Sequence, residues 1–340
     1  MSDHPSINRR HALKALTAAA TAMAIPGCAP RSEELVTPTP FRISLAQWSL
    51  HRTLFGAETS QERLRGLSGD ALIDTLRNRP EYLLRGALDP LDFPRFAQET
   101  FGITAVEYVN TFYFGKARDT RYLGELKTRA EDAGVTSVLI MCDLEGDLGA
   151  PDTKVRQQSV ENHHKWVDAA AFLGCHAIRV NAKSEGTRDE QMRLAADGLS
   201  SLADYAARQN IRILVENHGG LSSDTDWLVS VMKEAGHDNL GTLPDFGNFA
   251  DNGPYAFDRY RDVEQLMPYA HAVSAKSLDF GPDGEHVGFD FRRLVEIVQS
   301  AGYHGYIGIE FEGEHLDEIA GIRATKALLD SFLPAKATHP

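Results

Sequence analysis

The sequence predicts an α/β protein in which a single domain folds as a (β/α)8 TIM barrel, with helices inserted after the first strand. Short apolar runs alternate with polar amphipathic stretches, a Gly or Asn often ends the amphipathic stretch, and eight such units follow one another. Strands and helices that alternate at about 30–45 residues per unit favour a parallel sheet, and eight units favour a closed barrel. A doubly wound open sheet is the alternative, but it needs a Gly-rich phosphate loop after its first strand, and residues 47–51 contain no Gly.

The eight predicted strands follow one another through the chain. With the preceding turn included where one is visible, they span residues 42–49, 101–107, 133–139, 173–179, 209–216, 235–240, 270–276 and 301–310. The segment 52–91 is too long for a loop and contains several leucines. It is predicted to form one or two helices on the face where such barrels carry their sites. The barrel as a whole is expected to span residues 41–335.

The N-terminus has the features of an export signal. Residues 8–14, which include Arg9 and Arg10, resemble the twin-arginine motif, and an Ala-rich apolar run follows. That run is too short to cross a bilayer comfortably. Its processing has two interpretations, which are cleavage after Ala24 or lipidation of Cys28. Residues 1–27 are therefore predicted to be an export signal and 28–40 a linker, with the protein in the periplasm or held in the envelope as a lipoprotein.

Composition and charge exclude several classes of protein. The 340 residues include 35 Lys or Arg and 48 Asp or Glu, so the formal net charge is -13, which argues against nucleic-acid binding. With 42% hydrophobic and 24% charged residues the chain is typical of a globular protein. The 3 cysteines are too few and too scattered for a disulfide framework or a thiolate zinc site. Any metal is therefore expected to be held by carboxylate and imidazole groups.

Polar residues end most of the predicted apolar strands. They are Gln47, Glu107, Asp143, Arg179 with Asn181, Glu216 with His218, Asp245, Ser274 with Lys276, and Glu310. A single carboxylate of this kind is typical of a structural ion pair, but structural ion pairs have no reason to prefer the carboxyl ends of strands. Glu216, Asp245 and Glu310 would repel one another without a cation between them. The pattern therefore predicts a divalent metal at this end of the barrel.

Three motifs resemble those of a known family. Residues 214–220 read LVENHGG around Glu216, residues 243–249 read LPDFGNF around Asp245, and residues 307–313 read IGIEFEG around Glu310. They are similar to motifs of the sugar isomerase and epimerase family with xylose-isomerase-like barrels. The resemblance covers roughly residues 42–332, and the motifs fall on strands five, six and eight. The segment 273–280, VSAKSLDF, resembles an exported branch of that family.

The resemblance implies a divalent metal, commonly Mn²⁺, Mg²⁺, Co²⁺ or Zn²⁺, held by two Glu, one Asp and one His. The position that corresponds to the His, two residues before Lys276, is Ser274 in this chain. His271 has the opposite strand parity and is expected to face outward. Ser274 is therefore an uncertain fourth ligand.

A metal in such a site polarises a sugar carbonyl and stabilises the enediolate that forms when a neighbouring carbon loses its proton. Glu216 and Glu310 are expected to be the catalytic pair, one removing the proton and the other returning it. Substrate binding is expected from a ring of polar side chains, namely Glu107, Arg179, Asn181, His218 and Lys276. For His218 and Glu107 a structural role is the alternative.

Together these features predict a metal-dependent sugar isomerase or epimerase. The substrate is expected to be unphosphorylated, because the chain has no phosphate-binding Gly loop and no Arg cluster at the ends of strands seven and eight. The first alternative is a lyase or hydratase that eliminates the aglycone from a 3-keto-glycoside through the same intermediate. The second is a non-catalytic carbohydrate-binding envelope lipoprotein. A hydrolase with several His ligands is disfavoured because the 13 histidines form no such cluster.

Overall fold

The structure is a computed structural model that describes residues 40–56, 66–249 and 258–334. The predicted export signal and all but the last residue of the predicted linker lie outside the described residues. Residues 57–65 of the predicted insertion also lie outside them.

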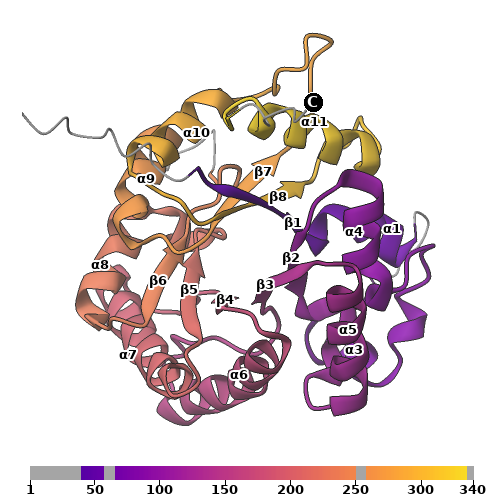
Figure 1. Cartoon of the computed structure of the whole chain (residues 1–340). Coiled ribbons are helices and arrows are strands. Elements are labelled where there is room, and N and C mark those ends of the chain that lie inside the picture. The colour runs from indigo at the N-terminus through magenta and orange to yellow at the C-terminus, as the bar shows by residue number, and fades with distance from the viewer. Residues whose placement is uncertain (1–39, 57–65, 250–257, 335–340) are drawn as a thin grey trace, which may run out of the picture. The chain divides into compact units, whose positions relative to one another are not determined.

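Eight parallel strands form the barrel, which confirms the predicted fold class (Figure 1). They are β1 (Arg42–Ala46), β2 (Ala105–Val109), β3 (Thr136–Met141), β4 (Ala177–Val180), β5 (Arg212–Glu216), β6 (Leu240–Leu243), β7 (Val273–Ser277) and β8 (Tyr306–Phe311). Their order in the sheet is β6-β5-β4-β3-β2-β1-β8-β7. Parallel bridges from Thr242 to Ala270 and from Asp245 to Ser274 bring β6 next to β7 and nearly close the sheet.

Helices surround the strands (Figure 1). They are α1 (His51–Phe55), α3 (Gly69–Asn78), α4 (Phe93–Phe101), α5 (Thr120–Asp132), α6 (Thr153–Leu173), α7 (Arg188–Ala207), α8 (Thr225–Ala235), α9 (Arg259–Leu266), α10 (Phe291–Ser300) and α11 (Glu318–Asp330). Short 3-10 turns occur at η1 (Gln47–Leu50), η2 (Pro80–Tyr82), η3 (Pro90–Asp92), η4 (Asn110–Lys116), η5 (Gly220–Ser223) and η6 (Met267–Tyr269). Among the described residues, no helix is long and apolar enough to cross a bilayer.

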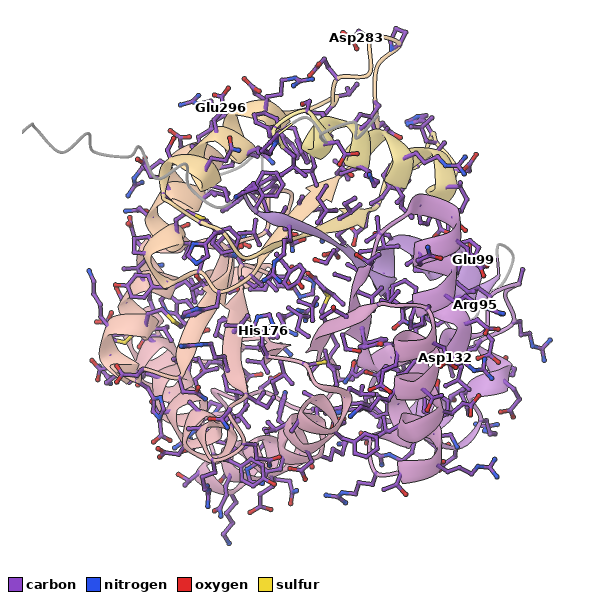
Figure 2. The ribbon with its side chains drawn as sticks, in the orientation of Figure 1. Arg95, Glu99, Asp132, His176, Asp283 and Glu296 are labelled. Carbon is purple, nitrogen blue, oxygen red and sulfur yellow. The ribbon has the colours of Figure 1, made fainter. Side chains whose placement is uncertain are left out.

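Local sequence explains where several helices begin and end. An Asp side chain accepts a backbone N–H at the start of α5, α6, α8, α9, α10 and α11. Gly102, Gly174 and Gly236 end α4, α6 and α8 with φ of 65°, 81° and 53°, a conformation that glycine adopts without strain. Charged side chains such as Glu99 and Glu296 point outward from these helices (Figure 2). The opposite helix faces pack on the strands.

The first strand is shorter than predicted. Residues 42–49 were expected to be extended, but β1 ends at Ala46 and the chain turns at η1. The side-chain Oε1 of Gln47 accepts the Val109 N–H at 3.0 Å, and Ser49 Oγ donates to the Ile309 carbonyl at 3.0 Å. These long-range bonds hold η1 across the carboxyl ends of β2 and β8. The described part of the insertion then continues with α1, α3, η2 and η3.

Candidate functional site

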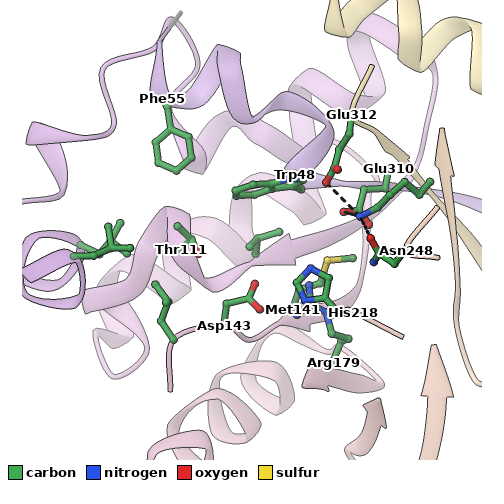
Figure 3. A pocket seen from close by; sticks show the side chains of 15 residues that line it. Trp48, Phe55, Thr111, Met141, Asp143, Arg179, His218, Asn248, Glu310 and Glu312 are labelled. Carbon is green, nitrogen blue, oxygen red and sulfur yellow. Dashed lines mark hydrogen bonds and ion pairs between the residues drawn. The ribbon is translucent and has the colours of Figure 1, made fainter. Parts of the chain in front are cut away.

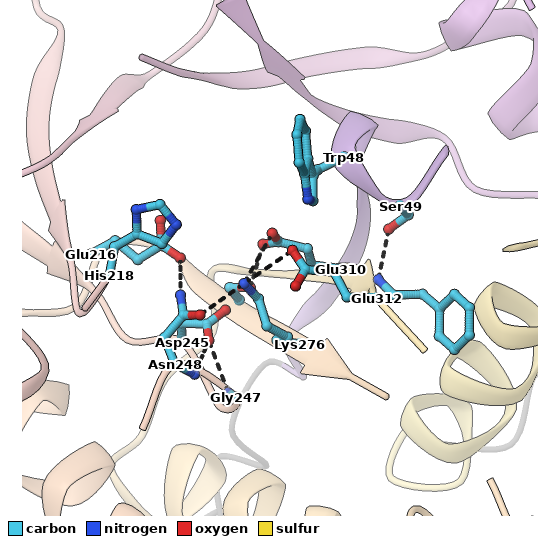
Figure 4. Close-up of polar contacts among 12 residues, drawn as sticks. Trp48, Ser49, Glu216, His218, Asp245, Gly247, Asn248, Lys276, Glu310 and Glu312 are labelled. Atoms are coloured by element: carbon cyan, nitrogen blue, oxygen red, sulfur yellow. Dashed lines mark hydrogen bonds and ion pairs between the residues drawn. The ribbon is translucent and has the colours of Figure 1, made fainter. Parts of the chain in front are cut away.

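Three acidic side chains converge at the carboxyl ends of the strands (Figure 4). Glu216 is the last residue of β5, Asp245 follows β6 by two residues, and Glu310 lies next to the end of β8. One carboxylate oxygen from each residue lies within 4.8 Å of the other two, and all three side chains are buried. We call this set the acidic triad. The structure therefore brings together the three residues that the sequence motifs single out.

Burial and neighbouring charges act differently on the three carboxyl groups. Burial raises the pKa of Glu216 to about 7, against the lowering effect of Arg179. Burial also raises the pKa of Asp245 to about 7, against the effect of Lys276. Burial acts in the same direction on Glu310, but the positive charges of Lys276 and Arg179 outweigh it and hold its pKa below the ordinary value. A divalent cation would replace the protons that Glu216 and Asp245 retain near neutral pH.

The donor set fits a hard divalent cation. Oδ1 of Asp245 accepts the backbone N–H groups of Gly247 and Asn248 at 2.9 and 2.8 Å, whereas its buried Oδ2 has no hydrogen-bond partner among the described residues. A buried carboxylate oxygen without a partner is costly unless a ligand satisfies it. Mg²⁺ and Mn²⁺ prefer oxygen ligands of this kind. Glu216, Asp245 and Glu310 are therefore the residues that would hold the metal.

Ser274 is close to the acidic triad but already has a partner within it. Its buried Oγ donates to Oε2 of Glu310 at 2.9 Å. His271 lies just before β7, and its Nε2 is 3.2 Å from Nη1 of Arg212, the first residue of β5. His271 is thus at the amino end of the barrel, away from the acidic triad. In the structure Ser274 positions Glu310.

Two buried cations flank the acidic triad. Nε of Arg179 lies 2.7 Å from Oε2 of Glu216. Nζ of Lys276 lies 3.4 Å from Oε1 of Glu310 and donates to Oδ1 of Asn248 at 3.0 Å. The Asn248 amide in turn donates to Oε1 of Glu216 at 2.9 Å (Figure 4). Asn248 therefore connects Glu216 with Lys276, which lies beside Glu310.

Arg179 also begins a polar chain that reaches His218. Oδ1 of Asp143 accepts from Nη1 of Arg179 and from Nδ2 of Asn181, both at 2.8 Å. With its amide orientation set in this way, Asn181 presents Oδ1 to Nδ1 of His218 at 3.0 Å. An amide oxygen only accepts, so Nδ1 of His218 carries the proton and Nε2 is left as an acceptor.

A cavity of about 510 Å³ adjoins the acidic triad, which reaches its lining through Glu310 (Figure 3). Its charged and polar lining comes from Thr111, Asp143, Arg179, His218, Asn248, Lys276, Glu310 and Glu312, and its apolar lining from Trp48, Phe55, Leu72, Leu76, Val109, Met141 and Leu144. Of the residues expected to bind substrate, Arg179, His218 and Lys276 line this cavity. Asn181 lines an adjoining cavity that shares His218 with it.

Glu107, the fifth expected substrate-binding residue, lies within the barrel and does not line the cavity. Its Oε1 accepts from Oγ of Ser44 at 2.6 Å, and its carboxylate fills the space where Gly308 has no Cβ. A Cβ at position 308 would lie 2.5 Å from Oε2 of Glu107. Burial raises the pKa of Glu107 to about 8, although the Ser44 hydroxyl lowers it. Its position favours the structural alternative.

The sequence interpretation missed two polar residues of the site. Asn248 and Glu312 both lie inside motifs that were recognised for Asp245 and Glu310, and Glu312 has the same strand parity as Glu310. For Glu312 the two-residue spacing from Glu310 was a signal, and for Asn248 the signal was its place in the motif around Asp245. Trp48 follows the early end of β1, which exposes its ring to the cavity.

Comparison with known proteins gives results consistent with this geometry. Residues 95–332 match the family described as "Xylose isomerase-like TIM barrel". The chain is 26% identical over 146 residues to inosose dehydratase from Geobacillus thermodenitrificans (strain NG80-2), a match that spans 36% of this chain and 48%, about half, of that relative.

Solved structures with the same fold include the following two. The 3-keto-D-glucoside 4-epimerase from E. coli, in its apo form, superposes with a TM-score of 0.59 at 17% identity, covering 72% of this chain and 94% of that one. A xylose isomerase-like TIM barrel protein from Mycobacterium smegmatis in complex with magnesium gives a TM-score of 0.54 at 17% identity, covering 85% and 96%. With the family match extending over most of the barrel, the chain belongs to the xylose isomerase-like TIM barrel family.

Proposed function

We propose that this protein is a divalent-metal-dependent enzyme that isomerises or epimerises an unphosphorylated sugar. The observation that carries the proposal is the buried acidic triad, whose member Glu310 lines the cavity together with the neighbouring Arg179 and Lys276. Bound there, the metal would act as a Lewis acid on the sugar carbonyl and its neighbouring hydroxyl. Members of the family include sugar epimerases and dehydratases, which supports an enzymatic role.

The chain's own residues supply the proton transfer and the positioning. We assign Glu216 and Glu310 to the removal and return of the proton next to the carbonyl, because both carboxylates lie in the acidic triad and come from different strands. Lys276 and Arg179 would stabilise the negative charge that develops on the substrate oxygens. Nε2 of His218, which has no hydrogen-bond partner among the described residues, would accept a hydrogen bond from a sugar hydroxyl. Return of the proton to the opposite face gives an epimer, and its return to the neighbouring carbon gives an isomer.

The charges around the cavity support a neutral substrate. Asp143, Glu310 and Glu312 line it, and Lys276 is already within 3.4 Å of two of these carboxylates. A phosphate group would therefore meet acidic side chains whose compensating cations are already engaged. A neutral sugar has no such penalty.

Elimination is the second candidate reaction. It shares the proton-abstraction step and then expels a group from the carbon next to the one that lost the proton. The similarity to an inosose dehydratase supports it, as does a cavity with room beyond the charged side chains.

Solvent exchange tests the shared step. The full chain, loaded with Mn²⁺ or Mg²⁺, is incubated in heavy water with a panel of neutral ketoses and keto-glycosides and followed by NMR. We expect deuterium at the carbon next to the carbonyl in at least one sugar, with a new isomer or a released aglycone identifying the reaction. Absence of exchange with the whole panel would reject the enzymatic proposal and favour a carbohydrate-binding protein.

Metal analysis tests the ligands. We expect Glu216→Ala, Asp245→Ala and Glu310→Ala each to lose a near-stoichiometric divalent metal while remaining folded. Glu312→Gln is the matched control, because Glu312 lines the cavity outside the acidic triad and should leave the metal bound. Full metal occupancy in Glu216→Ala would show that the acidic triad does not hold it.

A further inference from the structure

The cavity beside the acidic triad has two chemically different ends. In Figure 3, Arg179, Glu310 and Glu312 lie at one end, and Phe55 lies at the other, with Trp48 between them. Leu72 and Leu76 of α3 also line the cavity. The apolar end is therefore built largely from residues that follow β1 in the chain, whereas the charged end comes from later strands.

The apolar end is a preformed aromatic surface. The ring centroid of Trp48 lies 6.2 Å from that of Phe55 and 5.8 Å from that of Phe112, and those of Phe55 and Phe112 are 5.1 Å apart. These contacts fix the rings in place. Water in such a space finds few hydrogen-bond partners, so an apolar group is its favoured occupant.

Leu144 extends the apolar lining to the rim of the cavity. Its backbone has a φ of 64°, in the left-handed region that a leucine rarely adopts, and its side chain is 38% exposed. The residue directly follows Asp143, which belongs to the polar chain from Arg179. An unfavourable backbone conformation thus keeps an exposed apolar side chain in the cavity lining next to Asp143, and strain of this kind is characteristic of functional sites.

We propose that the substrate is a glycoside whose sugar ring occupies the charged end of the cavity and whose flat, apolar aglycone occupies the end formed by Trp48, Phe55, Leu72, Leu76 and Leu144. The inference rests on the proposed function and specifies its substrate class. The cavity of about 510 Å³ falls in the range of ~300–1,000 Å³ that encloses drug-sized ligands. A free ketose, with a polar group on every carbon, would leave the apolar end unfilled.

Equilibrium binding tests this subsite without requiring turnover. The metal-loaded full chain is titrated by calorimetry with matched pairs of phenyl and methyl β-glycosides of glucose, galactose and mannose. We expect the phenyl member of at least one pair to bind about tenfold or more tightly than its methyl partner. Leu72→Asn and Leu144→Asn should each reduce that preference to about threefold or less. Asn tolerates the left-handed backbone at 144, which protects the second variant against misfolding.

Val155→Asn is the matched control. Val155 is an exposed apolar residue on α6, 55% exposed against 38% for Leu144, and it is not among the residues that line the cavity, so the phenyl preference should be unchanged. Equal affinity within every pair, undetectable binding of every glycoside, or a phenyl preference that survives both cavity variants would overturn the inference. Deuterium exchange separates this failure from that of the proposed function. Exchange of a free ketose with no phenyl preference rejects only the aglycone subsite, whereas a phenyl preference without any exchange rejects only the enzymatic role.

Discussion

The side-chain amide of Asn217 makes two hydrogen bonds with the backbone of Asp245. Its Nδ2 donates to the Asp245 carbonyl at 3.0 Å, and its Oδ1 accepts the Asp245 N–H at 2.7 Å. Asn217 directly follows β5, so this pair joins the carboxyl ends of β5 and β6 and orients Asp245 in the acidic triad. Asn110 makes the same two bonds with Asp143, at 2.8 and 3.0 Å.

Asn217→Ala should therefore weaken metal binding without removing a ligand. Loss of a residue that orients a metal ligand typically costs about 10–100-fold in affinity, and we expect a decrease of this size by calorimetry. Asn110→Ala is the control, because it removes the equivalent pair at Asp143, outside the acidic triad, at a similar cost of about 1–3 kcal/mol in stability. Equal losses of metal affinity in both variants would show that general destabilisation is the cause.

Ser274→His should raise the affinity for a divalent metal. Oγ of Ser274 lies 2.9 Å from a carboxylate oxygen of Glu310, and the Ser274 backbone forms a parallel β-bridge with Asp245. An imidazole at this position would therefore add a nitrogen ligand to three oxygens. Ser274→Ala removes the hydroxyl without adding a ligand and serves as the control. A metal affinity in Ser274→His no higher than in Ser274→Ala would place the fourth ligand elsewhere.

Lys276→Met should separate metal binding from catalysis. Burial lowers the pKa of Lys276, but Asp245, Glu310 and Glu312 raise it more, so the side chain is positively charged. Removing this charge from beside the acidic triad should strengthen metal binding by about tenfold, through lost repulsion. The rate of deuterium exchange should fall by about 100-fold, because a group that stabilises the developing negative charge is lost. Lys233→Met, at an exposed position of α8, should change neither quantity.

Glu107→Gln should change how stability depends on pH. The pKa of Glu107 is about 8 in the folded protein, mainly because of burial, against an ordinary value of 4.5. Between these values the folded state holds a proton that the unfolded state has released, so the free energy of unfolding falls as pH rises from about 4.5 to 8, by a few kcal/mol. Gln mimics the protonated form and can still accept from Ser44.

Urea unfolding of the parent and Glu107→Gln at pH 5, 6.5 and 8 measures this effect. The variant should gain stability relative to the parent as pH rises and should be the more stable of the two at pH 8. A constant difference across the three pH values would contradict the protonated state of Glu107.

We also propose that the protein is exported by the twin-arginine route. Replacing both Arg9 and Arg10 by Lys should keep the full chain in the cytoplasm of a bacterial host, because the export machinery recognises the arginine pair. Cell fractionation measures this, and the parent provides the reference. Cys28→Ala distinguishes the two processing routes, since it should release the protein from membranes only if Cys28 is lipidated. Periplasmic accumulation of the double Lys variant would reject the proposed route.

The linear pattern of the chain determined the barrel and the gathering of the acidic triad. Eight apolar runs separated by helix-like stretches can bury their faces together only as a parallel sheet covered by helices. Because the carboxyl ends of parallel strands lie at one mouth of a barrel, residues that end different strands, such as Glu216 and Glu310, must approach one another. Glycine marked the ends of α4, α6 and α8 in the sequence, because glycine tolerates the positive φ at which these helices end.

Tertiary structure alone decided the features that depend on contacts between distant segments. The early end of β1 at Ala46 follows from hydrogen bonds of Gln47 and Ser49 to β2 and β8. Glu107 lies inside the barrel because Gly308, about 200 residues later, leaves room for its carboxylate. The apolar end of the cavity exists because α3 packs against η4 and brings Leu72 to the barrel mouth. Side-chain packing of this kind depends on the relative placement of whole elements, which periodicity and local turn preferences do not specify.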